Sequence, residues 1–403
     1  MTTTINNEQK KLNVPNLRFP EFQGEWEKTK FGDIATGFDY GMNAAAKNYD
    51  GVNKYIRITD IDEASSTYTD KDIVSPDGIL TDNYLVNNRD ILLARTGAST
   101  GKSYLYKKTD GKLYYAGFLI RANVTTHDPY FVFSQLHTHR YWRWVSIMSA
   151  RSGQPGINSQ EYSSFPIYIT SIEEENKIAK LLSLLDERIA TQNKIIEDLK
   201  KLKSAIIDYA INSLDSGFVK FGSLYEMAGE GGTPTTSNAS FYDNGKIPFI
   251  KIDDLKQKYL TENKDFITEL GLQKSSAWLV PTHSILFSNG ATIGEISITT
   301  YPVCTKQGIL GIVPKQNIDV EFLYYFMSSS YFKKAVSRIV TEGTMKTAYL
   351  KDINNILCPI PTKEKQQEIA KMPSALNSKI DFERSILKLF CSQKQHLLRQ
   401  MFI

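Results

Sequence analysis

The sequence is short of the residues that several classes of protein require. Its three cysteines, Cys304, Cys358 and Cys391, are too few and too scattered for a disulfide framework. The longest uncharged stretch, residues 275–294, contains proline, histidine, asparagine and glycine and is too polar to cross a bilayer. The segment Met1–Lys11 lacks the apolar core of a signal peptide. These absences argue against disulfide-stabilised, secreted and membrane-spanning proteins, and predict a cytoplasmic protein with reduced thiols.

Composition and length place the chain among folded, multidomain proteins. Hydrophobic residues make up 41% and charged residues 23% of the 403 positions, which excludes wholesale disorder. At about 150 residues per domain, this length predicts two or three domains. The net charge of +4 permits a polyanionic partner without requiring one. A local surplus is clearer, because six basic residues between Arg95 and Arg121 accompany a single acidic one, Asp110, with tyrosines between them.

Five short segments recur in the same order at a nearly constant offset in residue number, between 190 and 194. The clearest is Tyr55–Ile61, which returns as Phe249–Leu255 with the same alternation of side chains. The matched segments are 31–34 with 221–224, 55–61 with 249–255, 91–93 with 285–287, 97–101 with 290–294, and 165–167 with 358–360. Any single match is at chance level, but the conserved order favours a tandem duplication. Runs rich in β-branched and aromatic residues, separated by turns, predict that each copy is a compact α+β module.

A long helix is predicted after each module. From residue 178 to residue 206, apolar positions alternate at spacings of four and three, which is the heptad pattern of a coiled coil. Adding 191 gives a second pattern in register, in which Glu383 and Lys394 mirror the polar exceptions Gln192 and Lys203. The predicted helix-pairing seam consists of Ile178, Leu182, Leu185, Ile189, Ile196, Leu199 and Ile206 in the first helix and Ile369, Leu376, Ile380, Leu387, Phe390 and Leu397 in the second. Each stripe could bury against its own module, but two matching stripes favour pairing.

The glycine-rich segment Arg95–Ser103 is a near miss for a phosphate-binding P-loop. Gly97 and Gly101 enclose three residues where that motif has four, and Glu295 replaces the lysine in the second copy. Nucleotide binding is therefore not predicted. Two interpretations remain: a turn that presents backbone N–H groups to a ligand, or a hairpin turn with no ligand.

Metal and nuclease sites have little support. Asp253, Asp254, Glu262 and Lys264 form the loose carboxylate-and-lysine pattern of metal-dependent nucleases, but the first copy lacks its E-x-K part. The histidines at 137 and 139 have no further Cys or His group beside them, which does not predict zinc. We therefore expect no catalytic residue and no metal site, and keep a stand-alone nuclease as an alternative.

Two diverged modules, each followed by a helix in conserved register, together resemble the specificity subunits of type I restriction-modification systems. The resemblance spans nearly the whole chain and is carried by Val14–Trp26, Ile167–Ile189 and Pro359–Ala370. It implies two target-recognition domains that each read half of a split double-stranded DNA site, and paired helices that set the gap and dock two methyltransferase subunits. It also implies a chain with no active site and no cofactor. S-adenosylmethionine, ATP and magnesium would be used by the methyltransferase subunits and by restriction subunits that translocate and cut DNA.

The expected fold is α+β, with the two long helices pairing as an antiparallel coiled coil with pseudo-two-fold symmetry. The expected domains are a flexible N-terminus at 1–14, target-recognition domains at 15–170 and 215–362, and conserved helices at 171–214 and 363–403. Pro373 departs from the pattern, since it occupies a seam position where the first copy has Leu182. The second helix could begin after this proline or kink at it.

Phosphate contacts supply affinity to DNA binding, whereas contacts to base edges supply specificity. Lys107, Lys108 and Lys112 are assigned to phosphates. The residues assigned to bases are Arg95, Arg121, Arg151 and Gln154, because arginine suits guanine and glutamine suits adenine. The predicted DNA-binding residues are Arg57, Arg95, Thr96, Ser99, Lys102, Lys107, Lys108, Lys112, Arg121, Arg151, Gln154 and Asn158 in the first module, and Lys251, Asn289, Thr292, Lys306, Gln307, Lys346 and Thr347 in the second. For each of them the alternative is a solvated surface residue.

The two modules differ in local charge. Between Asn289 and Lys315 the second module has two lysines and one glutamate, so we expect its half-site to be held by fewer phosphate contacts. Unlike modules imply an asymmetric bipartite target. A coiled-coil scaffold that never contacts DNA is the remaining alternative.

Overall fold

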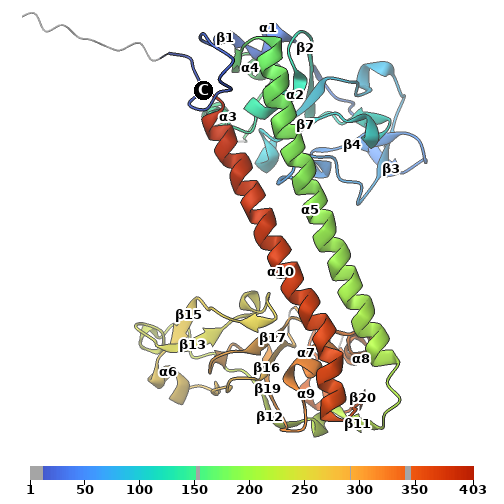
Figure 1. Ribbon diagram of the computed structural model, residues 1–403, viewed down its shortest axis with the longest axis vertical. Helices are drawn as coiled ribbons and strands as arrows, with labels where there is room; N and C mark the ends of the chain where they lie inside the picture. The colour runs from blue at the N-terminus through green and yellow to red at the C-terminus, as the bar shows by residue number, and fades with distance from the viewer. Residues whose placement is uncertain (1–11, 151–154, 291, 341–345) are drawn as a thin grey trace, which may run out of the picture. The chain divides into compact units, whose positions relative to one another are not determined.

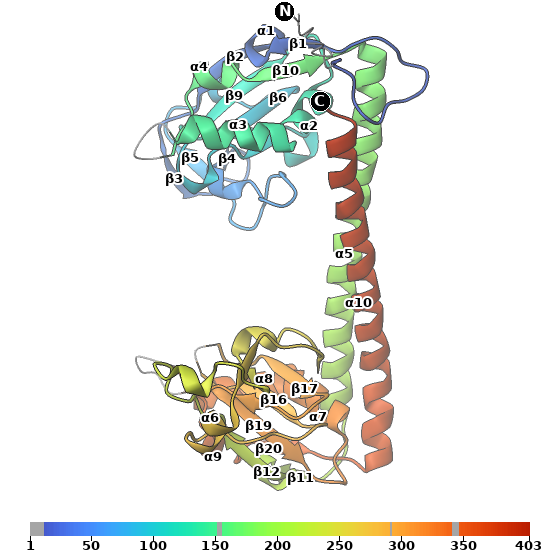
Figure 2. The same ribbon diagram turned by 90° about the vertical axis from the view of Figure 1, so that its left-hand side faces the viewer.

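The computed structural model of the chain describes residues 12–150, 155–290, 292–340 and 346–403. The chain forms two compact units: the first comprises residues up to Asn193 together with Ile386–Ile403, and the second comprises Lys194–Ser385. Two long helices, α5 (Ile172–Asn212) and α10 (Lys363–Gln400), contribute residues to both units (Figures 1 and 2). None of the described helices combines the length and apolar character that a bilayer crossing requires.

The first unit is organised around a four-stranded antiparallel sheet in the order β2-β9-β6-β7. Its strands are β2 (Ala35–Tyr40), β9 (Leu119–Val124), β6 (Asp90–Ala94) and β7 (Ser103–Leu105). Strand β6 is buried along its whole length. Three two-stranded sheets accompany it: β1 (Glu27–Lys30) with β10 (Pro166–Ile169), β3 (Ala45–Asn48) with β5 (Val74–Asp77), and β4 (Lys54–Ile56) parallel to β8 (Leu113–Tyr115). The helices are α1 (Phe31–Ile34), α2 (Pro129–Gln135), α3 (His139–Ser149) and α4 (Ser159–Ser163), with short 3-10 turns at Ile58–Asp60, Asp82–Tyr84, Gly97–Ser99 and Lys108–Asp110.

The second unit repeats the four-stranded arrangement of the first main sheet and adds a fifth strand at one edge. Its main sheet has the order β12-β19-β16-β17-β14, formed by β12 (Tyr225–Glu230), β19 (Ile309–Pro314), β16 (Ile285–Ser288), β17 (Ile296–Thr299) and β14 (Tyr259–Leu260). Strand β11 (Phe218–Lys220) pairs with β20 (Leu357–Pro359), and β13 (Ile247–Ile250) lies between β15 (Asp265–Ile267) and the parallel β18 (Cys304–Thr305). The helices are α6 (Glu269–Gln273), α7 (Val320–Ser328), α8 (Ser330–Ile339) and α9 (Leu350–Ile353), with 3-10 turns at Phe221–Ser223, Ala239–Phe241 and Ile252–Asp254. The predicted α+β class with two tandem modules is confirmed.

The helices that follow each sheet begin in the same way in both units. The Asp128 side chain caps α2 by accepting bonds from Tyr130 N and Phe131 N at 2.8 Å, and Asp319 caps α7 through Phe322 N at 2.9 Å. An aspartate at this position satisfies backbone N–H groups that the first helical turn leaves unpaired. Because the two aspartates occupy equivalent positions of the repeat, α2 and α7 begin at equivalent positions in the two units.

The first turn of each long helix is fixed to these same caps. Glu175 Oε2 accepts the backbone N–H of Asp128 at 3.0 Å, and Gln366 Oε1 accepts that of Asp319 at 2.8 Å. Both acceptors are buried. Burial raises the pKa of Glu175, whereas its bonds from backbone N–H groups and from His127 act in the opposite direction. Each long helix is therefore anchored to the domain that precedes it in the chain.

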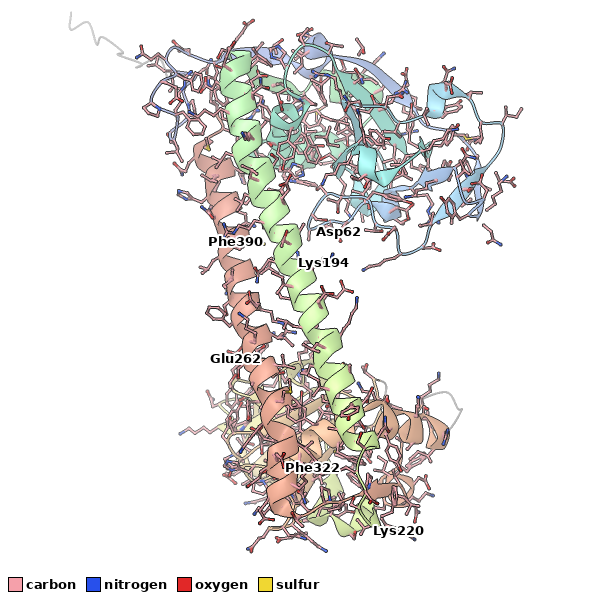
Figure 3. The ribbon with its side chains drawn as sticks, turned by 45° about the vertical axis from the view of Figure 1, so that its right-hand side comes forward. Asp62, Lys194, Lys220, Glu262, Phe322 and Phe390 are labelled. Carbon is pink, nitrogen blue, oxygen red and sulfur yellow. The ribbon has the colours of Figure 1, made fainter. Side chains whose placement is uncertain are left out.

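Within each unit the two long helices run antiparallel. In the first unit Asp186 contacts Lys394, and the Arg188 guanidinium lies 4.9 Å from the ring centroid of Phe390, which is labelled in Figure 3. Residue numbers therefore rise along α5 as they fall along α10. All thirteen predicted seam residues are buried or half-buried. The second helix does not begin after Pro373, because α10 runs from Lys363 to Gln400 with this proline inside it.

Candidate nucleic-acid interface

Equivalent loops of the two units are joined by the same backbone hydrogen bonds. In the first unit Arg95 N donates to Phe118 O at 3.0 Å and Ile157 N donates to Arg95 O at 2.9 Å. In the second unit Asn289 N donates to Gly308 O and Ala348 N donates to Asn289 O, both at 3.0 Å. The loop that leaves the central strand is thus held between two others in each unit, and Asn289 is the structural counterpart of Arg95.

Each unit thus contains one cluster of loops at this end of its central strand. The first loop cluster comprises residues 95–99, 116–118 and 155–158, and the second comprises residues 289–290, 292–293, 306–308 and 346–348. Three segments that are distant in sequence meet in each cluster, at one end of a buried strand. Loops held on a rigid sheet are where recognition residues are commonly found.

Glycines shape the turn at the base of both clusters. Gly101 and Gly294 each donate a backbone bond to the end of the central strand, to Ala94 O and Ser288 O respectively, at 3.0 Å. Their φ angles are +93° and +107°, in the left-handed region that favours glycine. A Cβ atom on Gly101 would also lie 2.8 Å from a methyl group of Val145. The glycines noted in the sequence therefore allow the chain to reverse direction after the central strand. The reversal from Ala94 to Gly101 is one residue longer than the equivalent one from Ser288 to Gly294.

The first loop cluster presents a cation beside exposed aromatic rings. The Arg95 guanidinium lies 4.6 Å from the ring centroid of Tyr40, whose hydroxyl accepts a bond from Ser159 N at 3.3 Å. Phe118 is 60% exposed. Arg95 has no carboxylate partner among the described residues, so its donors are free for a ligand. Of the other predicted residues, Thr96 and Ser99 lie in the same turn, and Asn158 caps α4 through Glu161 N at 2.9 Å.

Sequence reasoning missed the two aromatic residues of this cluster. Tyr40 ends strand β2, which is paired with β9, and only that pairing brings it to Arg95. Phe118 lies within the basic stretch between Arg95 and Arg121 and is not among the predicted DNA-binding residues. An exposed aromatic residue beside a glycine turn was the one available signal for Phe118, and the sequence held none for Tyr40.

The second loop cluster differs in its side chains. Thr292, Lys306, Gln307 and Lys346 are exposed on it, and Thr347 is half-buried. Asn289 is only 1% exposed, and its Nδ2 donates to Ala348 O at 3.3 Å. This predicted DNA-binding residue therefore lies beneath the cluster and holds it together. Thr233, which the sequence did not indicate, joins the cluster by accepting Gln307 N at 3.3 Å.

The basic stretch of the first module is divided between two ends of the sheet. Lys107, Lys108 and Lys112 are exposed on the connection that follows β7, where Tyr106 N donates to Asp90 O at the start of β6. Arg95 lies at the opposite end of that strand. The three lysines thus form a separate group, called the basic edge. Lys54 lies beside it, because its Nζ donates to Asp110 O of the same connection at 2.8 Å. Their contact with DNA stays a prediction.

Four other predicted cations already have carboxylate partners. Lys102 contacts Glu63 at 3.2 Å, Arg121 contacts Asp39 at 3.1 Å and Lys251 contacts Asp265 at 2.8 Å. Arg57 is held by Asp60 at 2.8 Å and Asp72 at 3.0 Å, and these hydrogen bonds raise the pKa of Arg57 above its ordinary value. DNA contact by any of them requires exchange of a partner. Arg151 and Gln154 lie outside the described residues.

The carboxylates of the nuclease alternative do not assemble a metal site in the described part of the chain. No group of three His, Cys, Asp or Glu side chains that could hold a metal occurs among those residues. Asp253 is paired with Lys256 at 3.3 Å, and Asp254 accepts the backbone N–H of Lys251 at 2.8 Å. Glu262, labelled in Figure 3, belongs to no such group among the described residues.

Comparison with known proteins connects this architecture to a family. The family model for the type I restriction modification DNA specificity domain matches twice, at residues 23–201 and 214–389. The chain belongs to the family of type I restriction-modification specificity subunits. The type I restriction enzyme MjaVIII specificity subunit of Methanocaldococcus jannaschii is 24% identical over 395 residues, which cover 91% of this chain and 89% of that one. The MjaIX specificity subunit of the same organism is 30% identical over 190 residues, covering 46% and 43%.

Solved structures agree on the fold. The crystal structure of a type I restriction-modification S subunit from M. genitalium has a TM-score of 0.58 and 17% identity, and covers 97% of this chain and 99% of that chain. As a specificity subunit, the chain is a non-catalytic protein with two domains that recognise a DNA target. The loop clusters are its candidate recognition surfaces.

Proposed function

We propose that the chain reads an asymmetric, split DNA target, with one half-site contacted by each loop cluster. The observation that carries this proposal is that Arg95 and Asn289 make equivalent backbone hydrogen bonds, so that the same loop framework occurs in both units while the exposed side chains on it differ. A guanidinium donates in a fork that suits guanine, whereas the second cluster presents threonine, glutamine and lysine. Because the two loop clusters share a backbone framework but expose different side chains, they are expected to read two different half-sites.

Residues outside the clusters contribute affinity in this proposal. The basic edge of Lys107, Lys108 and Lys112 contacts phosphates, which supplies binding energy with little sequence information. Methylation and cleavage are carried out by partner subunits, which use S-adenosylmethionine, ATP and magnesium. The site of action is the cytoplasm, where the DNA is.

The two long helices are proposed to dock two methyltransferase subunits. Leu181 on α5 and Met372 on α10, which occupy equivalent positions of the repeat, are 37% and 58% exposed although the seam beside them is buried. We infer that these two side chains form part of the surfaces that the methyltransferase subunits cover. Leu181→Glu and Met372→Glu are each expected to remove one methyltransferase subunit from the purified complex, leaving one, and the double variant to remove both.

The experiment that tests the function is methylation mapping of DNA from cells that express the candidate methyltransferase subunit with and without this chain. The expected result is a split motif with modified bases in both halves that depends on this chain. Exchanging residues 31–165 for another module should change one half of the motif only. A soluble complex that modifies no chain-dependent motif would contradict the proposal and favour a scaffold that does not contact DNA.

A further inference from the structure

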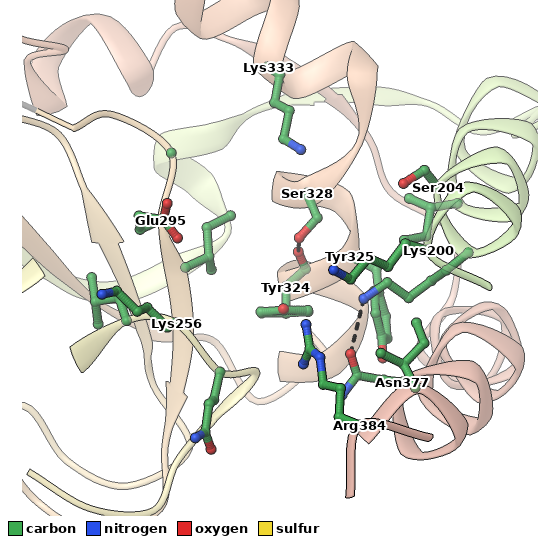
Figure 4. Close-up of a pocket in the computed structure, with 17 residues that line it drawn as sticks. Lys200, Ser204, Lys256, Glu295, Tyr324, Tyr325, Ser328, Lys333, Asn377 and Arg384 are labelled. Atoms are coloured by element: carbon green, nitrogen blue, oxygen red, sulfur yellow. Dashed lines mark hydrogen bonds between the residues drawn. The ribbon is translucent and has the colours of Figure 1, made fainter. Parts of the chain in front are cut away.

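The second unit contains a cavity of about 340 Å³ where its domain meets α5 and α10. Its charged lining consists of Lys200, Lys203, Lys256, Lys333 and Arg384, with Glu295 as the one carboxylate in the lining (Figure 4). These side chains come from both long helices, from α8 and from the segments around β14 and β17. Five cations and one carboxylate give the cavity a strong positive potential.

Three of the five cations have no carboxylate partner among the described residues. Lys200 and Lys333 have no ion pair or hydrogen bond among the described residues, and Lys203 donates to the neutral Asn377 at 3.0 Å. Only Lys256 and Arg384 have carboxylate partners, the exposed Asp253 at 3.3 Å and Asp381 at 3.0 Å. The pKa of Lys203 is lowered, first by burial and then by the positive charge of Arg384. Bringing these cations together costs free energy that a bound anion would recover.

The equivalent positions of the first unit are arranged differently. Asp186 occupies the place of Asn377, so the lysine equivalent to Lys203, Lys394, has a carboxylate at 2.6 Å. The positions of Lys200, Lys333 and Arg384 are taken by the uncharged Cys391, Trp142 and Asn193, and the position of Lys256 by Asp62. His137, equivalent to Ser328, contacts Ser66 Oγ at 2.9 Å. The concentration of cations is therefore specific to the second unit and is not a requirement of the shared fold.

The lining suits a phosphate group. Ammonium and guanidinium groups are donors without acceptor capacity, and Tyr324 adds a hydroxyl that has no hydrogen-bond partner among the described residues. Burial raises the pKa of Tyr324 well above its ordinary value, so the hydroxyl keeps its proton and can donate. Lys200, Lys256 and Lys333 are exposed, which leaves the cavity open to an anion from solution. Several charge-assisted donors around one opening match the oxygens of a phosphate.

We propose that this cavity is a phosphate-binding site that the loop clusters do not include. Two sources could supply the group: a phosphate of the DNA backbone, which rests on the proposed function, or a small phosphate compound. The second domain would then bind a phosphate of the DNA backbone, or a small phosphate compound, at a place separate from its recognition loops.

The test uses the full chain with inorganic phosphate as the probe, against chloride at equal ionic strength. Wild type should gain about 3 °C in Tm at a phosphate concentration roughly ten times Kd. The double variant Lys200→Gln/Lys333→Gln should lose this gain, while Lys334→Gln, a neighbouring exposed lysine of α8 outside the cavity, should keep it. Asn377→Asp, which places a carboxylate beside Lys203, should reduce the gain as well.

Two further measurements check that the double variant is folded and identify where the bound phosphate comes from. Because Lys200 and Lys333 have no described partners, the double variant should melt in chloride at or above the wild-type Tm. The salt dependence of DNA binding by the methyltransferase complex distinguishes the sources: a log–log slope smaller by roughly two units in the double variant indicates DNA phosphates, and an unchanged slope with the phosphate gain lost indicates a small phosphate compound. An equal Tm gain in wild type and the double variant overturns the proposal. If the wild-type chain directs no methylation motif, that result would instead count against the proposed function.

Discussion

Lys394 Nζ lies 2.6 Å from Asp186 Oδ1 in the first unit, and the equivalent pair in the second unit, Lys203 Nζ and Asn377 Oδ1, lies 3.0 Å apart. Each lysine occupies a seam position of its helix and reaches the partner helix. The duplication has thus kept a polar cross-helix contact in both units but has changed its acceptor from a carboxylate to an amide. A polar contact within an apolar seam fixes the register of two helices at some cost in stability.

The charge at Asp186 provides the first prediction. Asp186 also accepts the hydroxyl of Tyr130, so Asp186→Asn removes the charge from two hydrogen bonds that lie largely out of solvent. We expect a loss of about 1–3 kcal/mol in the free energy of unfolding of the full chain. Asp381→Asn, which affects the exposed pair with Arg384, should cost less than about 1 kcal/mol. Urea denaturation measures both, and equal effects would show that the Asp186 charge contributes nothing beyond a surface pair.

Arg95 provides the second prediction. Arg95→Ala should weaken binding of the assembled complex to its target by about 1–3 kcal/mol and relax the preference at one base pair of one half-site. The control is Arg143→Ala, since Arg143 is an exposed arginine on α3 with no described partner. Competition binding with single-base variants of the target separates the two effects. A uniform loss over all sequences would assign Arg95 to a phosphate instead of a base.

The basic edge provides the third prediction. Replacing Lys107, Lys108 and Lys112 by glutamine should weaken binding to specific and non-specific DNA alike, because phosphates carry no sequence information. The slope of log K against log salt should fall by about 0.9 for each phosphate that is no longer neutralised. Binding isotherms at several salt concentrations measure it. If the slope does not change, these lysines face solvent in the complex.

Periodicity and repetition were sufficient to predict much of the fold. The heptad positions identified both long helices, since an apolar stripe that recurs in register, polar exceptions included, is the mark of a duplicated helix. Pro373 could not be interpreted in the same way. Its effect depends on tertiary contacts, and Ser374, the next residue, is held by Lys258 at 3.0 Å and by Tyr325 at 3.1 Å.

The candidate site was predictable only in part, because sequence distance and spatial distance diverge. The loop at Arg95 was found from its glycines, yet its partner Tyr40 comes from β2, the strand of the main sheet that is earliest in the chain. Conversely, Lys107 is near Arg95 in sequence and lies at the other end of β6. The ion pairs could not be predicted either, because nothing in the sequence indicates that Lys102 contacts Glu63.

His137 provides the last prediction, on acid stability. Its Nδ1 lies 2.9 Å from Phe133 O and its Nε2 lies 2.9 Å from Ser66 Oγ, and burial, followed by the positive charge of Lys394, lowers the pKa of His137 to about 4. Between these pH values His137 is protonated in the unfolded chain and neutral in the folded chain. The free energy of unfolding should therefore fall as the pH drops from about 6.5 toward 4. His137→Ser, which introduces the residue found at the equivalent Ser328, should remove this part of the slope. Thermal unfolding of wild type and variant between pH 4 and 7.5 measures the difference, and parallel curves would show that His137 does not titrate in that range.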